Sequence, residues 1–438
     1  MKTMHTLETL GRLTRAAARR APWRFWPRIV PAREVPDRSA LAVDVQALIA
    51  SLDPQELRAH ADAYFSGMTL ASPQCRKPFM GPAESVQLCS QLGLLFEAAA
   101  LSRDADVLDF GCGTGWLTIA LARLGCNATG LDISPAAVNL ARRAAERELD
   151  KTDGSATFAV YDGMSLPFAD ATFDRVVCFD AFHHVIDQRA TIAELARVLR
   201  PGGRIAFVEP GPHHSTTPQS QHEMLQFRVI ENDVSMSAIA QYAAQSGLKP
   251  PEMLVQFQRP VRMPFDQFAR WTTQGVGSHE ARRLVQGLIS VMTDGQCFYL
   301  CKGDERHDSR RAEGLRAHLT LIEAARDADR RLLRFRIAIR NDGFAHWLCT
   351  ERRCGEVRLG VMKIGADGRV LQQDYARFSL PADEVAPGAA VEVSGSVRLP
   401  ADTSAAYSLR FDLVSRRVAW FAQQSPDTAV DWSPAGAG

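Results

Sequence analysis

The pattern of apolar and polar residues changes character along the chain. Between residues 107 and 209, short apolar runs alternate with stretches of helical periodicity, which is typical of a parallel sheet with crossover helices. This part is therefore predicted to have an α/β fold with a doubly wound sheet. Its strands are predicted at residues 106–110, 128–131, 157–161, 175–179 and 205–209, and its helices at residues 116–124, 135–148 and 191–199.

One of these helices carries its own start signal. Ser134 is a good N-cap residue, and Pro135 suits the first helical position because its missing N–H would have no partner inside the helix. The helix predicted at residues 135–148 therefore has a well-defined beginning.

After residue 316, helical periodicity is nearly absent. Short runs, several of them alternating, are separated by turn sequences such as Asp367-Gly368 and Pro387-Gly388, as in an antiparallel β-sandwich. The predicted strands are residues 332–339, 357–363, 370–380, 391–399, 407–414 and 418–421.

These patterns divide the 438 residues into parts, and the length suits two or three domains. The expected parts are a basic amphipathic arm (1–50), the α/β domain (51–303), a charged linker (304–316), the β-sandwich (317–425) and a flexible tail (426–438).

Composition limits the class of partner. The chain has 51 Lys and Arg against 50 Asp and Glu, a net charge of +1, which does not suit an electrostatic clamp for nucleic acid. Its apolar runs are shorter than the roughly 18 residues that a membrane-spanning helix needs. Nine scattered cysteines suit a reducing compartment. We expect a cytoplasmic protein with a small-molecule or glycan partner and no nucleic acid.

Charge is nevertheless segregated at the N-terminus. Residues 1–33 hold eight Lys or Arg and only one acid, Glu8, together with leucines and with Trp23 and Trp26. Such a segment could lie on an anionic membrane surface, which would place the protein peripherally at the inner membrane. A solvated arm that docks on the protein's own body is the alternative, and an Arg-rich, acid-poor start also suits an organelle transit peptide.

The strongest chemical signal is a glycine-rich turn between a buried strand and a helix. Glycines at 111, 113 and 115 allow the backbone to approach a ligand closely, and the following helix N-terminus offers free N–H groups. A dinucleotide fingerprint that starts at Gly111 would need a third glycine where Trp116 stands, and no Lys-Ser/Thr pair follows for a P-loop. The turn is therefore predicted to bind another kind of cofactor.

Acidic residues follow the next two predicted strands. Asp132 lies where a doubly wound fold presents a carboxylate to ribose hydroxyls, and Asp162 could accept a hydrogen bond from an adenine amino group. Because the carboxyl ends of parallel strands share one edge of the sheet, both acids are expected beside the glycine turn.

These motifs resemble class I S-adenosylmethionine-dependent methyltransferases, which have a Rossmann-like sheet. The resemblance rests on Asp109–Gly115, Asp132, Asp162 and the segment Arg197–Gly203. Gln296–Lys302 looks like the antiparallel last strand of that fold, which implies a helical, substrate-binding insert before this strand. It implies S-adenosyl-L-methionine as cofactor, with its methionine part, ribose and adenine held in that order along the chain. The implied cofactor-binding residues are Asp109, Gly111, Cys112, Gly113, Gly115, Asp132, Ile133, Asp162 and Gly163.

Methyl transfer is an in-line displacement, so a general base is needed only if the acceptor must lose a proton. His183 and His184 follow the fourth predicted strand, and His213 and His214 follow the fifth, with Glu209 beside them. His184 matches a histidine frequent in the resembled family. His184 and His214 are the catalytic candidates, and a loop-shaping hydrogen-bonding role is the alternative for His184.

Metal binding is the weaker hypothesis. His213, His214, His222 and Glu223 lie close in sequence but match no known ligand spacing. Two cysteine pairs, Cys297 with Cys301 and Cys349 with Cys354, also have unusual spacings for zinc. Their side chains are therefore expected to be small buried thiols. No metal site is predicted.

The predicted sandwich resembles accessory domains of bacterial polysaccharide-assembly enzymes, in which exposed aromatics such as Trp347 and Trp420 would stack on sugars. Core packing is the alternative for both rings. The first functional hypothesis is thus methylation of a hydroxyl or similar group on a glycan or lipid-linked saccharide. The alternatives are methylation of a small metabolite, such as a quinone precursor or natural product, and a non-catalytic glycan-binding scaffold.

Overall fold

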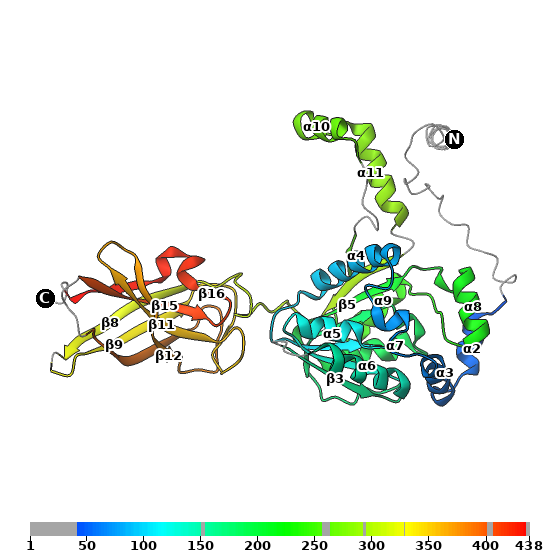
Figure 1. The fold of residues 1–438 in the computed structure, drawn as a ribbon, viewed down its shortest axis with the longest axis horizontal. Helices are drawn as coiled ribbons and strands as arrows, with labels where there is room; N and C mark the ends of the chain where they lie inside the picture. The colour runs from blue at the N-terminus through cyan, green and yellow to red at the C-terminus, as the bar shows by residue number, and fades with distance from the viewer. Residues whose placement is uncertain are drawn as a thin grey trace. The chain divides into compact units, whose positions relative to one another are not determined.

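The computed structural model describes residues 42–149, 154–255, 263–291, 295–327, 329–400 and 406–434. The basic segment at residues 1–33 lies outside them. The chain forms two compact units (Figure 1), which are described separately below. The first comprises Met1–Leu101 and Ala105–Asp304, and the second comprises Ser102–Asp104 and Glu305–Gly438.

The first unit is built on a seven-stranded sheet with the order β3-β2-β1-β4-β5-β7-β6. The first five strands along the chain pair in parallel, and β7 runs antiparallel to β5, as expected for the last strand. The prediction of a doubly wound α/β fold is confirmed. The strands are β1 (Asp106–Phe110), β2 (Asn127–Asp132), β3 (Ser155–Val160), β4 (Phe173–Phe179), β5 (Leu199–Pro210), β6 (Glu252–Leu254) and β7 (Gly295–Cys301).

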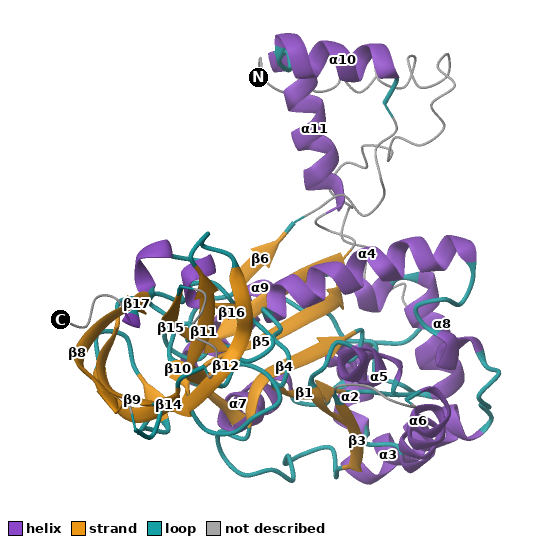
Figure 2. Ribbon diagram, turned by 60° about the vertical axis from the view of Figure 1, so that its left-hand side comes forward, coloured by secondary structure: helices purple, strands orange, loops and turns teal. Residues whose placement is uncertain are grey.

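Helices cover both faces of this sheet (Figure 2). Alternate residues of each strand supply the two cores: Val177 packs with α4 (Pro82–Ala99) and α5 (Trp116–Arg123), whereas Val176 packs with α7 (Gln188–Val198) and α9 (Met236–Gln245). Burial on both faces explains why these strands are continuous apolar runs. The helix predicted to start at Pro135 is α6 (Pro135–Glu148), and the Ser134 side chain caps it by accepting from Ala137 N.

The strand order reverses beside β1, whose neighbours are β2 and β4. In open α/β sheets, ligands bind in the crevice outside the carboxyl ends of the strands at such a point. The glycine turn after β1, the segment after β2 and the histidines after β4 therefore share one edge.

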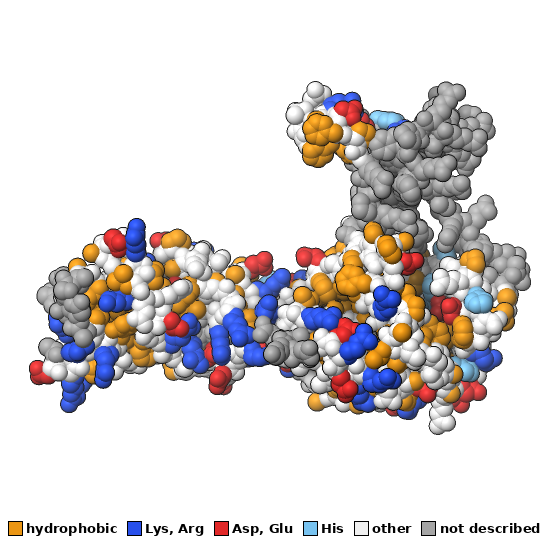
Figure 3. Space-filling view, viewed as in Figure 1, with side chains coloured by type: hydrophobic (Ala, Val, Ile, Leu, Met, Phe, Trp, Pro, Cys, Tyr) orange, Lys and Arg blue, Asp and Glu red, His pale blue; other side chains and the backbone are white. Residues whose placement is uncertain are grey.

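Further helices flank this edge. Before the sheet lie α2 (Val45–Ser51), α3 (Pro54–Ser66) and the short η2 (Pro73–Arg76). The expected helical insert follows β5, and its α8 (Pro218–Phe227) packs against α2 through Met224 and Leu48. The insert also contains two further helices, α10 (Phe265–Gln274) and α11 (Ser278–Val291). Apolar side chains are exposed on α10 (Figure 3). No helix in the described part of the chain is both long and apolar enough to cross a membrane.

The second unit consists of antiparallel sheets whose inner faces share one core around Trp347, Phe335 and Phe411. One sheet has the order β12-β11-β15-β16, with β17 also paired to β15, and another has the order β14-β9-β8. The strands are β8 (Ala317–Asp327), β9 (Leu332–Asn341), β10 (Trp347–Leu348), β11 (Val357–Gly365), β12 (Val370–Ser379), β13 (Glu384–Val385), β14 (Ala390–Arg398), β15 (Tyr407–Ser415), β16 (Ala419–Trp420) and β17 (Val430–Trp432).

Three features of this unit differ from the sequence expectations. Residues 305–316, expected as a linker, lie within the unit, and Ser309 and Leu315 are buried there. The β8 strand was not predicted because alanine and polar residues weaken its alternation. The expected flexible tail contributes β17, which pairs with β15 and buries Trp432, a single large apolar anchor in an otherwise polar segment.

Candidate active site

The three glycines of the turn after β1 have different surroundings. All three have positive φ, at 72° for Gly111, 49° for Gly113 and 80° for Gly115. A Cβ at Gly111 would lie 2.5 Å from the Ala181 Cβ, and one at Gly115 would lie 2.6 Å from the Ala141 Cβ. At Gly113 the nearest atom would be 3.5 Å away. Gly111 and Gly115 therefore permit close packing, whereas a Cβ at Gly113 would meet only the Phe65 ring, at an ordinary contact distance, and this is the more open side of the turn.

The Asp132 carboxylate holds this turn in place. One carboxylate oxygen accepts a hydrogen bond from Gly113 N at 2.9 Å, and the other accepts from Ser134 N at 2.9 Å. Burial raises the pKa of Asp132, although these two amide donors act in the opposite direction. Each oxygen keeps a further lone pair, so Asp132 can still accept from the two ribose hydroxyls of a nucleoside.

Asp109 and Cys112 are buried beside the turn. Asp109 accepts a 2.6 Å hydrogen bond from the Thr118 hydroxyl, and burial raises its pKa to about 7 in spite of that bond. The Cys112 amide donates to Leu131 O, and its Sγ lies 3.0 Å from the position of a Cβ on Gly130. Cys112 thus packs the turn against β2. Asp109 is the buried acid at the position where the methionine part of the cofactor is expected.

Asp162 and Gly163 follow β3 and come close to the β2 edge. The Asp162 carboxylate accepts from Met164 N and Ser165 N, at 2.8 and 2.9 Å, and these bonds lower its pKa. Gly163 has φ of 86°, and a Cβ there would lie 3.7 Å from Ile133 Cγ2. The structure therefore brings Ile133 and Gly163 together just after the ends of β2 and β3.

Helix α3 covers the same edge, which sequence reasoning did not anticipate. Asp62 accepts hydrogen bonds from the Ser134 hydroxyl (2.9 Å) and from Ala136 N (2.7 Å) at the start of α6. The Phe65 ring is the group nearest to the open side of Gly113. No local signal marks these residues, because their partners lie more than 40 residues away along the chain.

Five side chains converge beyond the ends of β4 and β5, and we call them the histidine cluster: His183, His184, Glu209, His214 and Glu231. The His183 Nδ1 lies 2.8 Å from Glu209 Oε2, and the His214 Nε2 lies 2.5 Å from Glu231 Oε2. Glu231 also faces the other two rings, with His183 Nε2 at 3.9 Å and His184 Nδ1 at 3.6 Å from its oxygens. Glu231 is therefore the centre of the cluster, and the sequence analysis did not identify it.

Glu209 holds the turn after β4 and is already fully engaged. Its Oε1 accepts from Ala181 N (3.1 Å) and Phe182 N (2.9 Å), and its Oε2 accepts from His183 N (3.3 Å) as well as from the His183 ring. Burial alone would lower the pKa of His183, but the hydrogen bond and charge of Glu209 raise it to about 9. Glu209 is therefore a positioning residue rather than a free base.

The two sequence candidates of the cluster differ in exposure. The His184 side chain is 42% exposed, whereas that of His214 is 19% exposed and is held by Glu231. His184 is thus the cluster's most accessible ring. His213, the neighbour of His214, is not one of the side chains that surround Glu231 and is the natural control position.

The four residues that lie close in sequence as possible metal ligands are not brought together as a metal-binding group. They are His213, His214, His222 and Glu223. Among the described residues, the one set of His, Cys, Asp or Glu side chains close enough to share an ion is His183, His184 and Glu231. The four cysteines of the two pairs are buried, with the pKa of Cys297 and of Cys349 raised to about 12 by burial. The expectation of ordinary buried thiols fits this environment.

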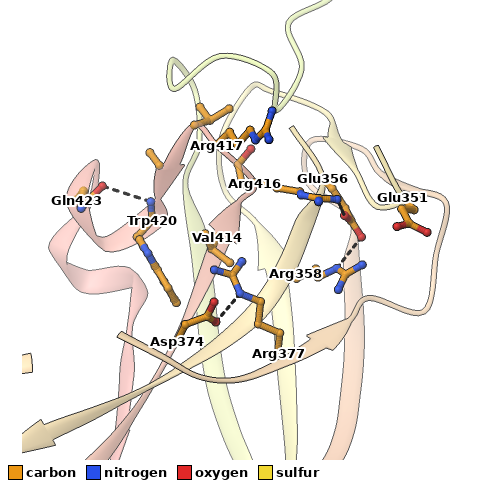
Figure 4. A pocket seen from close by; sticks show the side chains of 13 residues that line it. Glu351, Glu356, Arg358, Asp374, Arg377, Val414, Arg416, Arg417, Trp420 and Gln423 are labelled. Atoms are coloured by element: carbon orange, nitrogen blue, oxygen red, sulfur yellow. Dashed lines mark hydrogen bonds and ion pairs between the residues drawn. The ribbon is translucent and has the colours of Figure 1, made fainter. Parts of the chain in front are cut away.

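The second unit has a cavity of about 630 Å³ beside β16 (Figure 4). Its arginines face acids: Arg377 Nε lies 2.6 Å from Asp374, and Arg358 Nε lies 2.6 Å from Glu356. The Trp420 ring is covered by Arg377, and Trp347 is completely buried. Core packing is therefore confirmed for Trp347, whose ring fills the core between the sheets and cannot stack on a sugar.

Comparison with known proteins agrees with this geometry. A family model described as a methyltransferase domain matches residues 108–207. Demethylmenaquinone methyltransferase of Mycolicibacterium vanbaalenii is 30% identical over 198 residues, which are 44% of this chain and 78% of that relative. O-methyltransferase cnsE of Penicillium expansum is 38% identical over 104 residues, 24% of this chain. The chain spans only 37% of that relative's length.

A solved structure with similar architecture is phosphoethanolamine N-methyltransferase 2 of Haemonchus contortus in complex with S-adenosyl-L-methionine. It is 17% identical with a TM-score of 0.39, and the match covers 60% of this chain and 61% of that one.

The turn, the acids at the strand ends and the family match define a methyltransferase domain. The chain belongs to the S-adenosylmethionine-dependent methyltransferases. S-adenosyl-L-methionine is accordingly its cofactor, and the open side of Gly113, with Asp132 beside it, fits the close approach of that molecule.

Two glycine substitutions separate packing from ligand contact. Gly115→Ala should lower the free energy of unfolding by about 2–4 kcal/mol, because its Cβ would overlap Ala141 in a left-handed backbone. Gly113→Ala should cost only about 1–2 kcal/mol but weaken S-adenosylhomocysteine binding at least tenfold. Chemical unfolding and calorimetric titration measure the two effects. Unchanged affinity in Gly113→Ala would show that this side of the turn does not face the cofactor.

Binding should also depend on pH through Asp109. Since its pKa is about 7, Asp109 is mostly protonated at pH 6 and mostly ionised at pH 8. The cofactor's ammonium group favours the ionised form, so S-adenosylhomocysteine should bind up to about tenfold more tightly at pH 8 than at pH 6. Asp109→Asn keeps an acceptor for Thr118 and should remove the difference. A pH dependence that persists in Asp109→Asn would assign it to another group.

Proposed function

We propose that this protein transfers the methyl group of S-adenosyl-L-methionine to a hydroxyl of a small acceptor of the quinol or natural-product type. Two observations support a small acceptor: relatives are named for O-methylation and for demethylmenaquinone, and the two tryptophans expected to stack on sugars are buried or covered. These relatives match only parts of the chain, so the acceptor is the point that experiment must test.

The histidine cluster is the main support for a hydroxyl as the group that is methylated. A hydroxyl is a poor nucleophile until it loses its proton, so its methylation needs a nearby proton acceptor. His184 and His214 follow β4 and β5, whose carboxyl ends lie on the same sheet edge as the glycine turn. We assign the exposed His184 to contact with the acceptor and His214, bonded to Glu231, to removal of its proton.

Bound cofactor supplies a methyl group on a positively charged sulfur. The chain's own part is to hold the ribose at Asp132, to cover the turn with α3 and to position the acceptor oxygen beside His184. The proton passes to the His214 ring, and Glu231 stabilises the imidazolium that results.

Labelled methyl transfer identifies the acceptor class. The purified protein should move labelled methyl groups from S-adenosyl-L-methionine into small, solvent-extractable molecules of a cell extract. Label confined to the polysaccharide fraction would overturn the small-acceptor proposal in favour of a glycan. Asp132→Ala, which removes the ribose acceptor, is the background control and should give no label in either fraction.

His214→Ala should lower the rate of the chemical step by about 10²–10⁴-fold, because the acceptor's proton loses its partner. Affinity for S-adenosylhomocysteine should stay within about twofold of wild type, since His214 is not among the residues assigned to the cofactor. His213→Ala, one residue away, is the matched control and should retain wild-type activity. Equal activity of the two variants in single-turnover assays would remove His214 from the mechanism.

A further inference from the structure

We propose that the histidine cluster binds a divalent transition-metal ion, with His183, His184 and Glu231 as its ligands. One ring nitrogen of each histidine and one carboxylate oxygen lie within 4.8 Å of one another. Two imidazoles and a carboxylate form the ligand set of several zinc enzymes and of non-haem iron sites. The proposal departs from our sequence-based expectation of no metal, which did not consider Glu231 because this residue comes from a loop 47 residues beyond His184.

The spacing of these groups supports a bridging ion. His183 Nε2 lies 3.9 Å from Glu231 Oε2, too far for a hydrogen bond. Two ligands that each lie about 2.1 Å from one tetrahedral ion are about 3.4 Å apart. A shift of about half an ångström would therefore place both groups on the same ion, whereas a direct hydrogen bond would need a larger movement.

The surroundings of His183 and His184 are those of metal-binding histidines. Such histidines almost always bind a carboxylate or a carbonyl with the other ring nitrogen, which fixes the ring. His183 does so through Nδ1 to Glu209, whose carboxylate is itself fixed by backbone amides. The His184 Nδ1 lies 2.5 Å from the Ile230 carbonyl oxygen, so its other nitrogen, Nε2, is the one that can bind an ion. Both rings are thus oriented before any ion arrives.

The charge and exposure of the site suit a catalytic rather than a structural ion. Two buried carboxylates, Glu209 and Glu231, supply negative charge, with side chains 0% and 8% exposed. His183 is also buried, but His184 is 42% exposed, so solvent and an acceptor can reach one side. Three protein ligands leave coordination positions open, as in catalytic zinc sites.

This metal role rests on the proposed function, and it names what activates the acceptor. A hydroxyl oxygen bound to the ion would lose its proton more readily, and His214 would take that proton. The oxygen then forms a bond to the methyl carbon while the carbon–sulfur bond breaks and its electron pair stays on sulfur. The methylated acceptor and neutral S-adenosylhomocysteine leave, and the proton on His214 passes to solvent.

Direct metal titration tests the proposal on the full chain. After chelator treatment, Zn²⁺ titrated by calorimetry should bind at one ion per chain. His184→Ala and Glu231→Gln should weaken that binding at least tenfold. His213→Ala and Glu223→Gln, on neighbouring segments, are the controls and should bind as wild type does. Absence of binding by wild type, or equal binding by all four variants, would overturn the proposal.

A spectroscopic readout guards against variants that lose structure. Co²⁺ in the stripped wild-type protein should give visible absorption bands of a low-coordinate site, and these should disappear in Glu231→Gln while its melting temperature stays near that of wild type. S-adenosylhomocysteine titration of the same samples reports the proposed function separately. Cofactor binding without Zn²⁺ binding would refute only the metal site, and Zn²⁺ binding without cofactor binding would refute only the methyltransferase proposal.

Discussion

The buried carboxylate of Glu209 is the constraint on which the active edge depends. Leaving such a charge unpaired would cost several kcal/mol, so the segment after β4 must turn its amides toward it. Three consecutive amides, those of residues 181–183, do so, and the His183 ring adds a fourth donor. The direction of His183, and with it the position of the whole histidine cluster, follows from this requirement.

A second carboxylate applies the same logic on the cofactor side. Asp132 accepts hydrogen bonds from both the glycine turn and the residue before α6, and Asp62 of α3 accepts hydrogen bonds from the start of α6. The N–H groups and carboxylates of the edge are therefore oriented before a ligand binds. Polar groups that are preorganised in this way need no rearrangement during a reaction, which is the main source of electrostatic stabilisation in enzymes.

Local signals predicted what depends on local structure. The start of α6 followed from Ser134 and Pro135, and the central strands β1, β4 and β5 followed from apolar runs that are buried on both faces. Asp62, Phe65 and Glu231 were missed because long-range packing alone brings them to the site. Strand β8 was missed for another reason: alanine and polar residues hide its inward positions. Distance along the chain, rather than weak chemistry, thus limited the prediction of the site.

The distances around Glu231 bear on why the edge has so many histidines. A base for one hydroxyl proton needs a single imidazole with an acid behind it, and His214 with Glu231 already supplies that pair. His183 and His184 then face the same carboxylate at 3.9 and 3.6 Å without a hydrogen bond to it. The Nε2 of the buried His183 lies too far from Glu231 for a hydrogen bond, so a cation between these two groups gives this ring a function that general-base catalysis does not.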